Sequence, residues 1–204
     1  MNTVILADQP VAPSKVVCLG RNYVEHIAEL GNSRPEQMVF FFKPNSSISA
    51  DLKSSHGGEE LHYEAEICFG VVGGTLAYIG FGLDLTKRKL QSALKTNGLP
   101  WERAKAFQGS AVFSEFQKFS GNTDELEVEL LIDGVQTQIG SVEQMINRPE
   151  EILEEAKSFT EFEDFDILMT GTPKGVGTVS PGSVFEGVVS QRGVELTRAK
   201  WLAQ

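Results

Sequence analysis

Short β-type runs separated by turn signals recur along most of this 204-residue chain. This pattern restricts the possible fold classes more than any other feature of the sequence. Two hairpins are expected, one turning at Asp133 and Gly134 and the other at Arg192 and Gly193. Strands this short must pair into sheets to bury their apolar faces. The clearest runs are "KVVCLG" (15–20), "MVFFFKP" (38–44), "LHYEAEICFGVV" (61–72) and "DILMTG" (166–171).

Helical patterns are fewer than strand patterns. The longest begins with Ser141 and Gln144 spaced as a capping box and is interrupted by Pro149, so it predicts two helices. The chain has no repeat, low-complexity tract or linker, and we predict one β-rich α+β domain over residues 1–204. The helical segments are "YVEHIAEL" (23–30), "TKRKLQSALKTNG" (86–98) and "SVEQMINRPEEILEEAKSF" (141–159).

Composition excludes several kinds of partner. Acidic residues outnumber basic ones by 28 to 18, the formal net charge is -10, and no stretch collects enough cations to bind a row of phosphates. No window approaches the roughly 18 apolar residues of a membrane span, and the N-terminus does not resemble a signal peptide. Cys18 and Cys68 are expected to be core thiols. We therefore expect a cytoplasmic protein that binds neither nucleic acid nor membranes.

Two acidic residues, Glu64 and Glu66, lie one residue apart inside the apolar run at 61–72. On a strand, residues i and i+2 project from the same face, so the two carboxylates and His62 should lie together. Close carboxylates repel unless a cation or proton lies between them, although a solvated strand face would explain the pair without a ligand. If the pair binds a metal, oxygen ligands alone favour Mg²⁺ or Mn²⁺, whereas His62 would favour Zn²⁺ or another transition metal.

Six motifs of the chain resemble those of the fumarylacetoacetate hydrolase family in order and in wording. The resemblance extends from about residue 13 to the C-terminus. It is closest to the small single-domain branch of acylpyruvases, oxaloacetate decarboxylases and tautomerases, and isomerases of the 5-carboxymethyl-2-hydroxymuconate type. The motifs are "LGRNYVEHIAELGN" (19–32), "FFKP" (41–44), "HYEAE" (62–66), "GLDLTKRKLQ" (82–91), "LPWERAKAF" (99–107) and "ILMTGTPKGVG" (167–177).

The resemblance implies a mixed β-roll, usually a homodimer, with Glu64, Glu66 and Asp84 as ligands of a Mg²⁺ or Mn²⁺ ion. The local sequence agrees, because Thr86 could cap a helix that begins near residue 87 and so turn the chain directly after Asp84. Three carboxylates around a divalent ion leave a site of about -1 charge, with positions open for water and substrate. A metal would therefore explain the buried acidic pair.

His26 and Glu29 lie three residues apart on a predicted helix, hence on one face. Taken alone, the pair could be an exposed surface pair. The resemblance implies instead that the two residues activate water, with Glu29 orienting the imidazole of His26. Because the segment follows a glycine and ends at Gly31, we expect it to close over the site as a lid.

Four further residues match family positions near the substrate. The resemblance implies that Lys105 is a catalytic cation and that Gln91 faces the bound oxoacid. It also implies that Arg21 binds a substrate carboxylate and that Thr172 reaches the substrate pocket. Without the resemblance, Lys105 and Gln91 would be solvated helix residues, and Thr172 would belong to an ordinary turn.

The expected activity is that of a metal-dependent hydrolase acting on acylpyruvate-type 2,4-dioxo acids, such as fumarylpyruvate. It would cleave a C–C bond to give pyruvate and a carboxylic acid through an enolate. Oxaloacetate decarboxylation or tautomerisation, and isomerisation of a ring-fission product, pass through similar enolates and remain alternatives. A catalytically idle metabolite-binding relative is a further alternative. Lys89, where relatives usually carry Asp, and the short connection from Glu66 to Asp84 leave the choice of substrate open.

Overall fold

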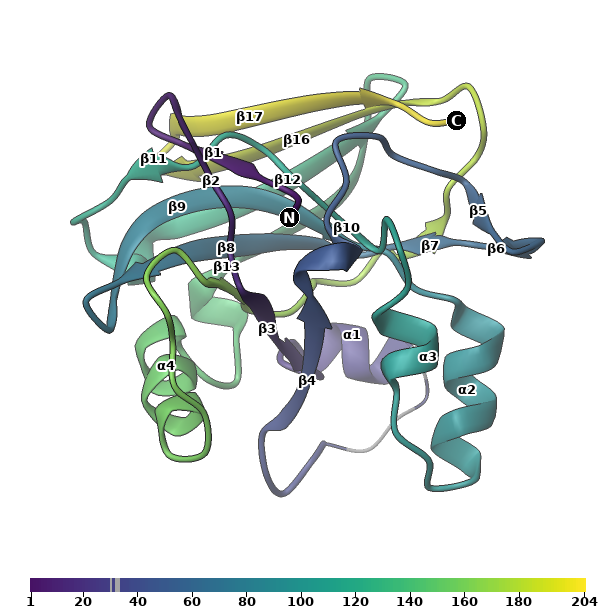
Figure 1. Ribbon diagram of the computed structural model, residues 1–204. Coiled ribbons are helices and arrows are strands. Elements are labelled where there is room, and N and C mark those ends of the chain that lie inside the picture. The colour runs from purple at the N-terminus through teal and green to yellow at the C-terminus, as the bar shows by residue number, and fades with distance from the viewer. Residues whose placement is uncertain (30, 32–33) are drawn as a thin grey trace.

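A mixed sheet forms the centre of the computed structural model, which describes residues 1–29, 31 and 34–204; within those residues this sheet has seven strands (Figure 1). Neighbouring strands run antiparallel except β14 and β3, which are parallel. The sheet is therefore mixed, as expected. Its order is β10 (Ala111–Phe113), β9 (Thr75–Asp84), β8 (Ala65–Val72), β14 (Ile167–Met169), β3 (Lys15–Gly20) and β4 (Val39–Pro44), and β11 (Gln117–Lys118) also pairs with β9.

A second, antiparallel sheet packs over the first, and the long strands β8 and β9 curve beneath it (Figure 1). The rings of Phe81 on β9 and Trp201 on β17 have centroids 6.0 Å apart, which joins the two sheets through the main core. The curled sheets match the expected β-rich α+β fold of the mixed β-roll type. The order of the second sheet is β13 (Val135–Ser141), β12 (Leu126–Ile132), β16 (Val184–Gln191) and β17 (Val194–Leu202).

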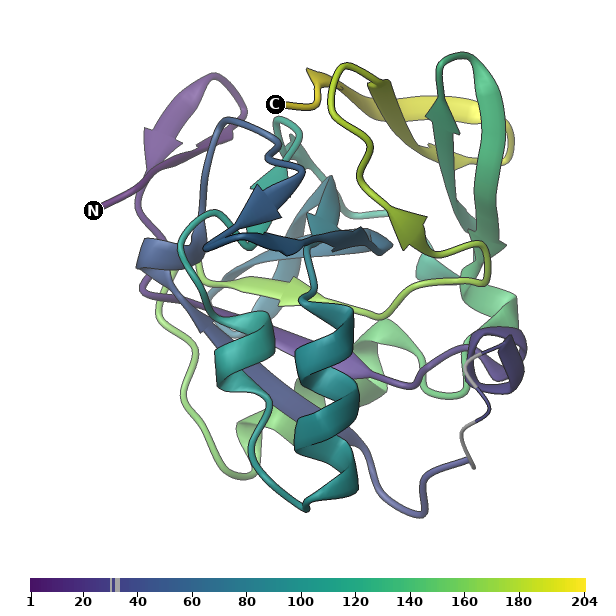
Figure 2. The same cartoon turned by 90° about the vertical axis from the view of Figure 1, so that its right-hand side faces the viewer.

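The helices lie on the side of β8 and β9 that faces away from the second sheet, and Figure 2 shows α2 and α3 next to each other there. No helix within the described ranges has the length and apolar character needed to cross a bilayer. The helices are α1 (Val24–Glu29), α2 (Arg88–Thr96), α3 (Glu102–Lys105) and α4 (Pro149–Lys157), with 3₁₀ turns η1 (Asn45–Ser47), η2 (Thr123–Glu125) and η3 (Val142–Gln144). The remaining strands pair as β1 (Val4–Leu6) with β2 (Gln9–Val11), β5 (Ser55–His56) with β6 (Glu59–Glu60), and β7 (His62–Tyr63) with β15 (Gly177–Thr178).

The β8–β9 hairpin explains the short connection between the acidic residues. The strands are joined at Gly73 and Gly74, whose φ angles of 57° and 69° suit a tight turn. At the far end of the hairpin the N–H of Asp84 donates to the carbonyl of Glu64 at 2.9 Å. Antiparallel pairing therefore brings residues 20 positions apart into contact, with no helix needed between the strands.

Several predicted elements are confirmed, and the differences have local causes. The hairpin turns at Asp133 and Arg192 occur as expected, each residue with positive φ. The run at 61–72 is interrupted at Glu64, so it forms two strands, β7 and β8. The helix predicted over 23–30 is α1, and its last predicted residue, Leu30, lies outside the described residues.

One expected helix start is wrong, and another is confirmed in part: the capping box of Ser141 and Gln144 and the break before Pro149 are present. Thr86 does not cap α2, whose first flanking residue is Lys87, because the Thr86 hydroxyl accepts a hydrogen bond from Lys105 instead. The Ser141 segment begins only the short turn η3, in which the Ser141 N–H donates to the Gln144 side chain at 2.9 Å. Pro149 begins the separate helix α4 at its first position, where its missing N–H costs nothing.

The close approach of the two sheets gives a test of the roll. A Cβ added to Gly187 on β16 would lie 2.2 Å from Cε1 of Phe81. We predict that Gly187→Ala lowers the free energy of unfolding by about 1–3 kcal/mol, because the core has no room for the methyl group. Urea denaturation measures this change. Ser190→Ala, on the same strand but only half-buried, should stay within about 0.5 kcal/mol of wild type, and equal midpoints for both variants would contradict the packing argument.

Candidate metal centre and substrate cavity

Three buried carboxylates lie together at one end of the β8–β9 hairpin. Glu64, Glu66 and Asp84 each offer an oxygen within 4.8 Å of the others. Glu64 lies in the break between β7 and β8, Glu66 on β8, and Asp84 at the end of β9. His62 does not join them, since its Nε2 lies 3.4 Å from the Thr178 hydroxyl. The described cluster therefore offers oxygen ligands alone, which weakens the Zn²⁺ alternative.

Two buried lysines face these carboxylates. Lys105 Nζ lies 2.6 Å from Asp84 Oδ2 and 2.8 Å from Glu64 Oε2, and it also donates to the Thr86 hydroxyl at 2.6 Å. Lys43 Nζ lies 2.8 Å from the other oxygen of Asp84 and donates to the carbonyl of Lys105. Asp84 is thus held by one lysine on each oxygen, and both lysines are almost fully buried.

Arg88 adds a third cation at the edge of the cluster. Its guanidinium pairs with Glu64 and donates to Gln91 Oε1 at 2.8 Å. With every group ionised, three carboxylates face three cations, Lys43, Lys105 and Arg88. A divalent ion would therefore leave an excess of positive charge, which a doubly negative substrate would neutralise.

The carboxylates differ in their electrostatic surroundings. Burial alone would raise the pKa of Glu64, but Lys105 and Arg88 outweigh it and hold that pKa well below its usual range. Burial, together with the charges of Asp84 and Glu64, raises the pKa of Glu66 well above its usual range. The pKa of Lys105 is raised, because the attraction of Asp84 and Glu64 exceeds the effect of burial.

Glu66 is the carboxylate that most needs a cation. Its side chain accepts the N–H of Gly171 at 2.6 Å, and no lysine or arginine in the described part of the chain pairs with it. A hard divalent ion such as Mg²⁺ or Mn²⁺ would supply the missing positive charge and accept oxygen ligands from all three residues. The residues present therefore fit such an ion.

A small cavity of about 30 Å³ adjoins the cluster. Its lining is rich in positive charge. The pKa of Lys95 in its wall is lowered, mainly by burial and further by the nearby charges of Arg21 and Arg88. A bound anion would relieve this crowding. The cavity holds little more than a water molecule, so a substrate requires its walls to move. Its polar lining comprises Arg21, His26, Glu64, Arg88, Gln91, Lys95 and Lys105, and Phe41 and Trp101 are its aromatic walls.

Helix α1 covers this cavity and brings His26 and Glu29 together. His26 is buried, and its Nδ1 lies 3.2 Å from Glu29 Oε2. The other Glu29 oxygen accepts the N–H of Gly175 at 3.0 Å, and Glu25 pairs with Lys174 at 3.0 Å. The helix is thus fastened to the loop that follows β14. The surface-pair interpretation of His26 is wrong, because its side chain faces the cavity.

The predicted substrate residues fall into two groups. Arg21, Gln91 and Lys105 line the cavity, and the Arg21 guanidinium lies 5.8 Å from the centre of the Trp101 ring. Thr172 does not line the cavity, and its hydroxyl accepts a hydrogen bond from Gln138 at 2.9 Å. It directly follows Gly171, whose N–H donates to Glu66. A substrate role for Thr172 stays a prediction.

Sequence reasoning missed Lys43, Arg88 and Trp101 as members of this site. Lys43 carried a usable signal, since it shares a strand face with Phe41 inside the apolar run "VFFFKP" and so had to be buried. Arg88 lies three residues before Gln91, a spacing that places both on one face of α2. Trp101 gave no signal beyond its motif.

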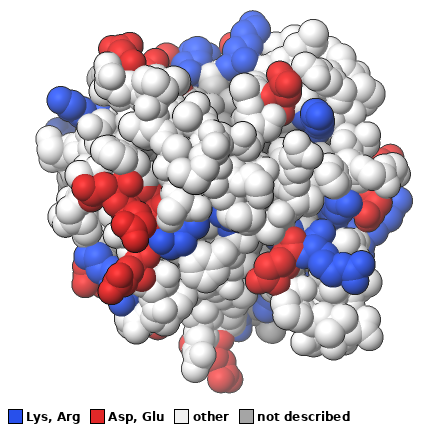
Figure 3. Space-filling view, viewed as in Figure 1, with Lys and Arg blue, Asp and Glu red and all other residues white. Residues whose placement is uncertain are grey.

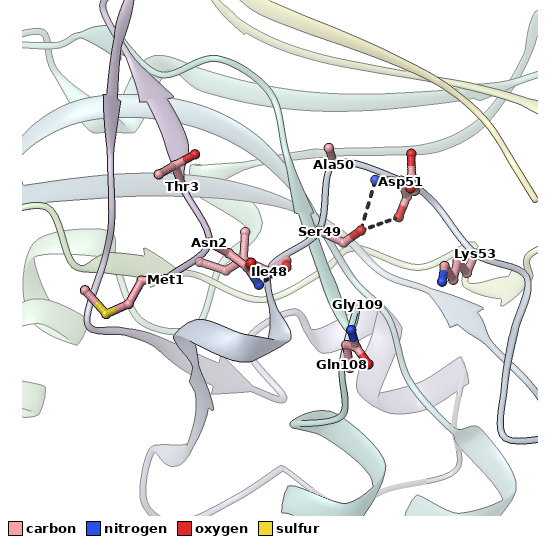
Figure 4. Close-up of a pocket in the computed structure, with 10 residues that line it drawn as sticks. All are labelled: Met1, Asn2, Thr3, Ile48, Ser49, Ala50, Asp51, Lys53, Gln108 and Gly109. Atoms are coloured by element: carbon pink, nitrogen blue, oxygen red, sulfur yellow. Dashed lines mark hydrogen bonds between the residues drawn. The ribbon is translucent and has the colours of Figure 1, made fainter.

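A second hollow has a different lining. A larger pocket of about 460 Å³ is formed by residues 1–3, 48–51, 53 and 108–109 (Figure 4). Its charged side chains are Asp51 and Lys53, and the Ser49 hydroxyl bonds to the backbone of Asp51. None of the predicted site residues lines it. On the face shown in Figure 3, acidic and basic side chains are interspersed in small groups.

Comparison with known proteins decides the family. The family model described as "Fumarylacetoacetate (FAA) hydrolase C-terminal" matches residues 15–195. The chain belongs to the fumarylacetoacetate hydrolase family. It is 36% identical over 198 residues to a curated relative, oxaloacetate tautomerase YcgM of Escherichia coli (strain K12), with 87% of this chain and 88% of the relative covered.

Solved structures of this family share the fold over the whole chain. A protein described as a putative fumarylacetoacetate isomerase/hydrolase from Oleispira antarctica superposes with a TM-score of 0.92 at 30% identity, and both chains are covered completely. Fumarylpyruvate hydrolase from Pseudomonas aeruginosa, solved with Mn²⁺ and pyruvate, gives a TM-score of 0.86 at 27% identity over 99% of this chain and 96% of that one. The predicted family and its β-roll fold are confirmed.

The acidic cluster gives a test of metal binding that does not depend on turnover. We predict that Mn²⁺ at 100 times its dissociation constant stabilises the wild-type protein by about 2.7 kcal/mol, because the ion binds the folded state alone. Glu66→Gln should lose most of this gain, since it removes one ligand charge. Thermal denaturation with and without Mn²⁺ measures the difference. Glu60→Gln, at an exposed position, should keep the full gain, and an equal response of both variants would contradict the assignment.

The raised pKa of Glu66 predicts how stability depends on pH without metal. The folded protein holds the Glu66 proton more tightly than the unfolded chain, so this contribution is complete below about pH 4.3, the ordinary value for Glu. It is lost as the pH rises through the raised folded value. In EDTA, Glu66→Gln should therefore become more stable than wild type as the pH increases. Urea titrations across this range measure the difference, and a constant difference would contradict the raised pKa.

Proposed function

We propose that this protein is a divalent-metal-dependent enzyme that interconverts the enol and keto forms of oxaloacetate and also promotes its decarboxylation. The observation that carries the proposal is the cavity beside the three carboxylates, whose lining includes four cationic side chains and one carboxylate. Such a lining suits a small substrate with two negative charges. The likeness to the Escherichia coli oxaloacetate tautomerase supports this substrate over the acylpyruvates that the sequence motifs favoured.

Charge balance supports a dicarboxylate in particular. The buried cluster is formally neutral, because Lys43, Lys105 and Arg88, which pair with Glu64 and Asp84, balance the charges of the three carboxylates. Adding a divalent ion and a doubly negative oxaloacetate would keep this cluster at zero charge, and the further cations Arg21 and Lys95 in the cavity wall also favour a doubly negative substrate over a singly charged one. Arg21 and Lys95, which also line the cavity, would bind the second carboxylate.

His26 is the proposed acid and base. Glu29 lies against His26 Nδ1, an arrangement that would hold the proton there and leave Nε2 to exchange a proton with the substrate. In the keto-to-enol direction, Nε2 would remove a proton from C3, and the imidazolium so formed would give this proton to the C2 oxygen. The reverse sequence restores the ketone, so that no atom is gained or lost.

The remaining groups orient the substrate and balance its charge. Lys105, a buried cation beside Glu64 and Asp84, would offset negative charge developing on the 2-oxo group. A divalent ion held by Glu64, Glu66 and Asp84 would supply Lewis-acid polarisation of that group. Helix α1, fastened through Glu29 to Gly175, would exclude water while the enolate exists.

Hydrolysis of an acylpyruvate is the second candidate function. It is supported by the likeness to the fumarylpyruvate hydrolase from Pseudomonas aeruginosa, at lower identity than the tautomerase relative. The same His26 would then activate a water molecule in place of a C–H bond. Because both reactions pass through an enolate, substrate turnover separates them.

Three assays decide among the candidates. Enol oxaloacetate is mixed with the protein and Mg²⁺ or Mn²⁺, and the loss of enol absorbance is followed. Pyruvate release from oxaloacetate and from fumarylpyruvate is measured in parallel. Rapid enol loss would support the tautomerase proposal, and pyruvate from fumarylpyruvate alone would support the hydrolase. Mn²⁺ binding without turnover of any substrate would support the idle metabolite-binding alternative.

Loss of the imidazole should affect the reactions unequally. We predict that His26→Ala lowers tautomerisation about 10²- to 10⁴-fold, the usual range for a general acid or base, and lowers decarboxylation less, because that step needs no proton removal from carbon. Glu29→Gln should follow the same order with a smaller loss. Initial rates at saturating Mn²⁺ measure both effects.

His56→Ala is the matched control, since the His56 ring packs at a tilt against Phe107 and does not line the cavity. It should leave both rates near wild type. Equal losses of both reactions in His26→Ala would contradict its role as base and would point to closure of α1 as the shared requirement.

A further inference from the structure

Gln138, a residue of β13 in the second sheet, connects two parts of the site that lie far apart in the sequence. Its side chain is buried, with 1% of its surface exposed. The amide oxygen accepts the N–H of Ala65, the residue between Glu64 and Glu66, at 3.0 Å. The amide nitrogen donates to the Thr172 hydroxyl at 2.9 Å and to the carbonyl of Pro173 at 2.8 Å.

The strand is shaped to present this side chain. Gln138 pairs with Leu130 and Gln136 pairs with Leu131, so Thr137 is an extra residue that forms a β-bulge. A bulge bends the strand and re-aims the side chain that follows it. Here the bulge directs Gln138 into the interior, whereas Gln136 stays exposed.

The loop after β14 fits closely against this bulge. A Cβ on Gly175 would lie 2.3 Å from the carbonyl oxygen of Thr137, and a Cβ on Gly140 would lie 2.7 Å from Pro173. Gly175 also has a φ of 98°, which disfavours other residues. Only glycine therefore allows β13 and the loop to approach as they do.

We propose that Gln138 is a positioning residue of the active site, acting through the Ala65 peptide on the carboxylates and through residues 172–175 on helix α1. The proposal rests on the function proposed above. The Ala65 bond fixes the backbone between Glu64 and Glu66, and so the directions of both carboxylates. The loop bonds fix the place of Gly175, whose N–H holds Glu29 and thereby the His26 imidazole.

A buried glutamine could also serve stability alone, because any buried amide needs partners. That role and the positioning role differ in what they predict. A purely structural residue would change the free energy of unfolding and leave the metal affinity of the folded protein unchanged. A positioning residue changes metal affinity and the local exchange of the amides that it orders.

The test compares Gln138→Met with Gln136→Met in the full chain. Met keeps the length of the side chain and loses its hydrogen bonds, and Gln136 supplies the matched control because it is exposed on the same strand. We expect Gln138→Met to weaken Mn²⁺ binding about 10- to 100-fold, as found for residues that orient metal ligands. Amide hydrogen exchange at Ala65 and Gly175 should be roughly tenfold faster. Gln136→Met should match wild type in both measurements.

Turnover adds a third measurement. In Gln138→Met, saturating Mn²⁺ should restore metal occupancy and leave kcat/KM for oxaloacetate below wild type, because the loop that holds α1 remains disturbed. If wild type does not turn over oxaloacetate, the proposed function fails, and Mn²⁺ affinity and amide exchange still test Gln138. Unchanged affinity and unchanged exchange would overturn the proposal even if the protein were less stable.

A milder variant tests the proposal if Gln138→Met does not fold. Thr172→Val keeps the shape of the side chain and deletes one acceptor of the Gln138 amide. Exchange at Gly175 should then be faster than in wild type, while Ala65, whose bond to Gln138 remains, should exchange at the wild-type rate. Wild-type exchange at both amides would overturn the proposal.

Discussion

The buried pairing of carboxylates and cations is the interaction on which the rest of this site depends. Glu64 and Asp84 are held by Lys105, and Asp84 also by Lys43, in an interior where an unpaired charge would be strongly unfavourable. Among the described residues, the Glu66 carboxylate has only the backbone N–H of Gly171 as its hydrogen-bond partner. Most of the buried negative charge is therefore compensated in the folded protein, while Glu66 still lacks a cation. This combination suits a metal ion.

Sheet geometry creates this cluster from residues that are distant in sequence. The β8–β9 hairpin places Asp84 beside Glu64, and the break after β7 allows Glu64 to leave the strand ladder. The antiparallel pairing of β14 with β8 brings the loop beyond β14 to the same end of the sheet. The bulge in β13 meets that loop from the second sheet. The three carboxylates thus lie on or beside β8 and β9, while α1, which carries His26, lines the cavity next to them.

Much of this could be predicted from the sequence because its signals are local. Alternating apolar residues indicate strands, and a pair such as Asp133 and Gly134, which tolerates positive φ, indicates a hairpin turn. The spacing of Glu64 and Glu66 places two carboxylates on one face of a strand. The family motifs then assigned Asp84 as the third ligand. A single domain, a homodimer and a cytoplasmic location remain predictions of the same kind, as does the Mg²⁺ or Mn²⁺ ion itself.

Local signals in the amino-acid sequence were enough to establish the β-rich fold class, the family and the residues able to bind a metal. Tertiary structure alone decided which cations neutralise them, because Lys43, Arg88 and Lys105 come from three separate elements whose approach depends on packing. It also decided that Thr86 binds Lys105 instead of capping α2, and that Gln138 faces the site. A hydrogen bond between distant segments leaves no periodic trace in a sequence, since its partners meet only when the sheets curl together.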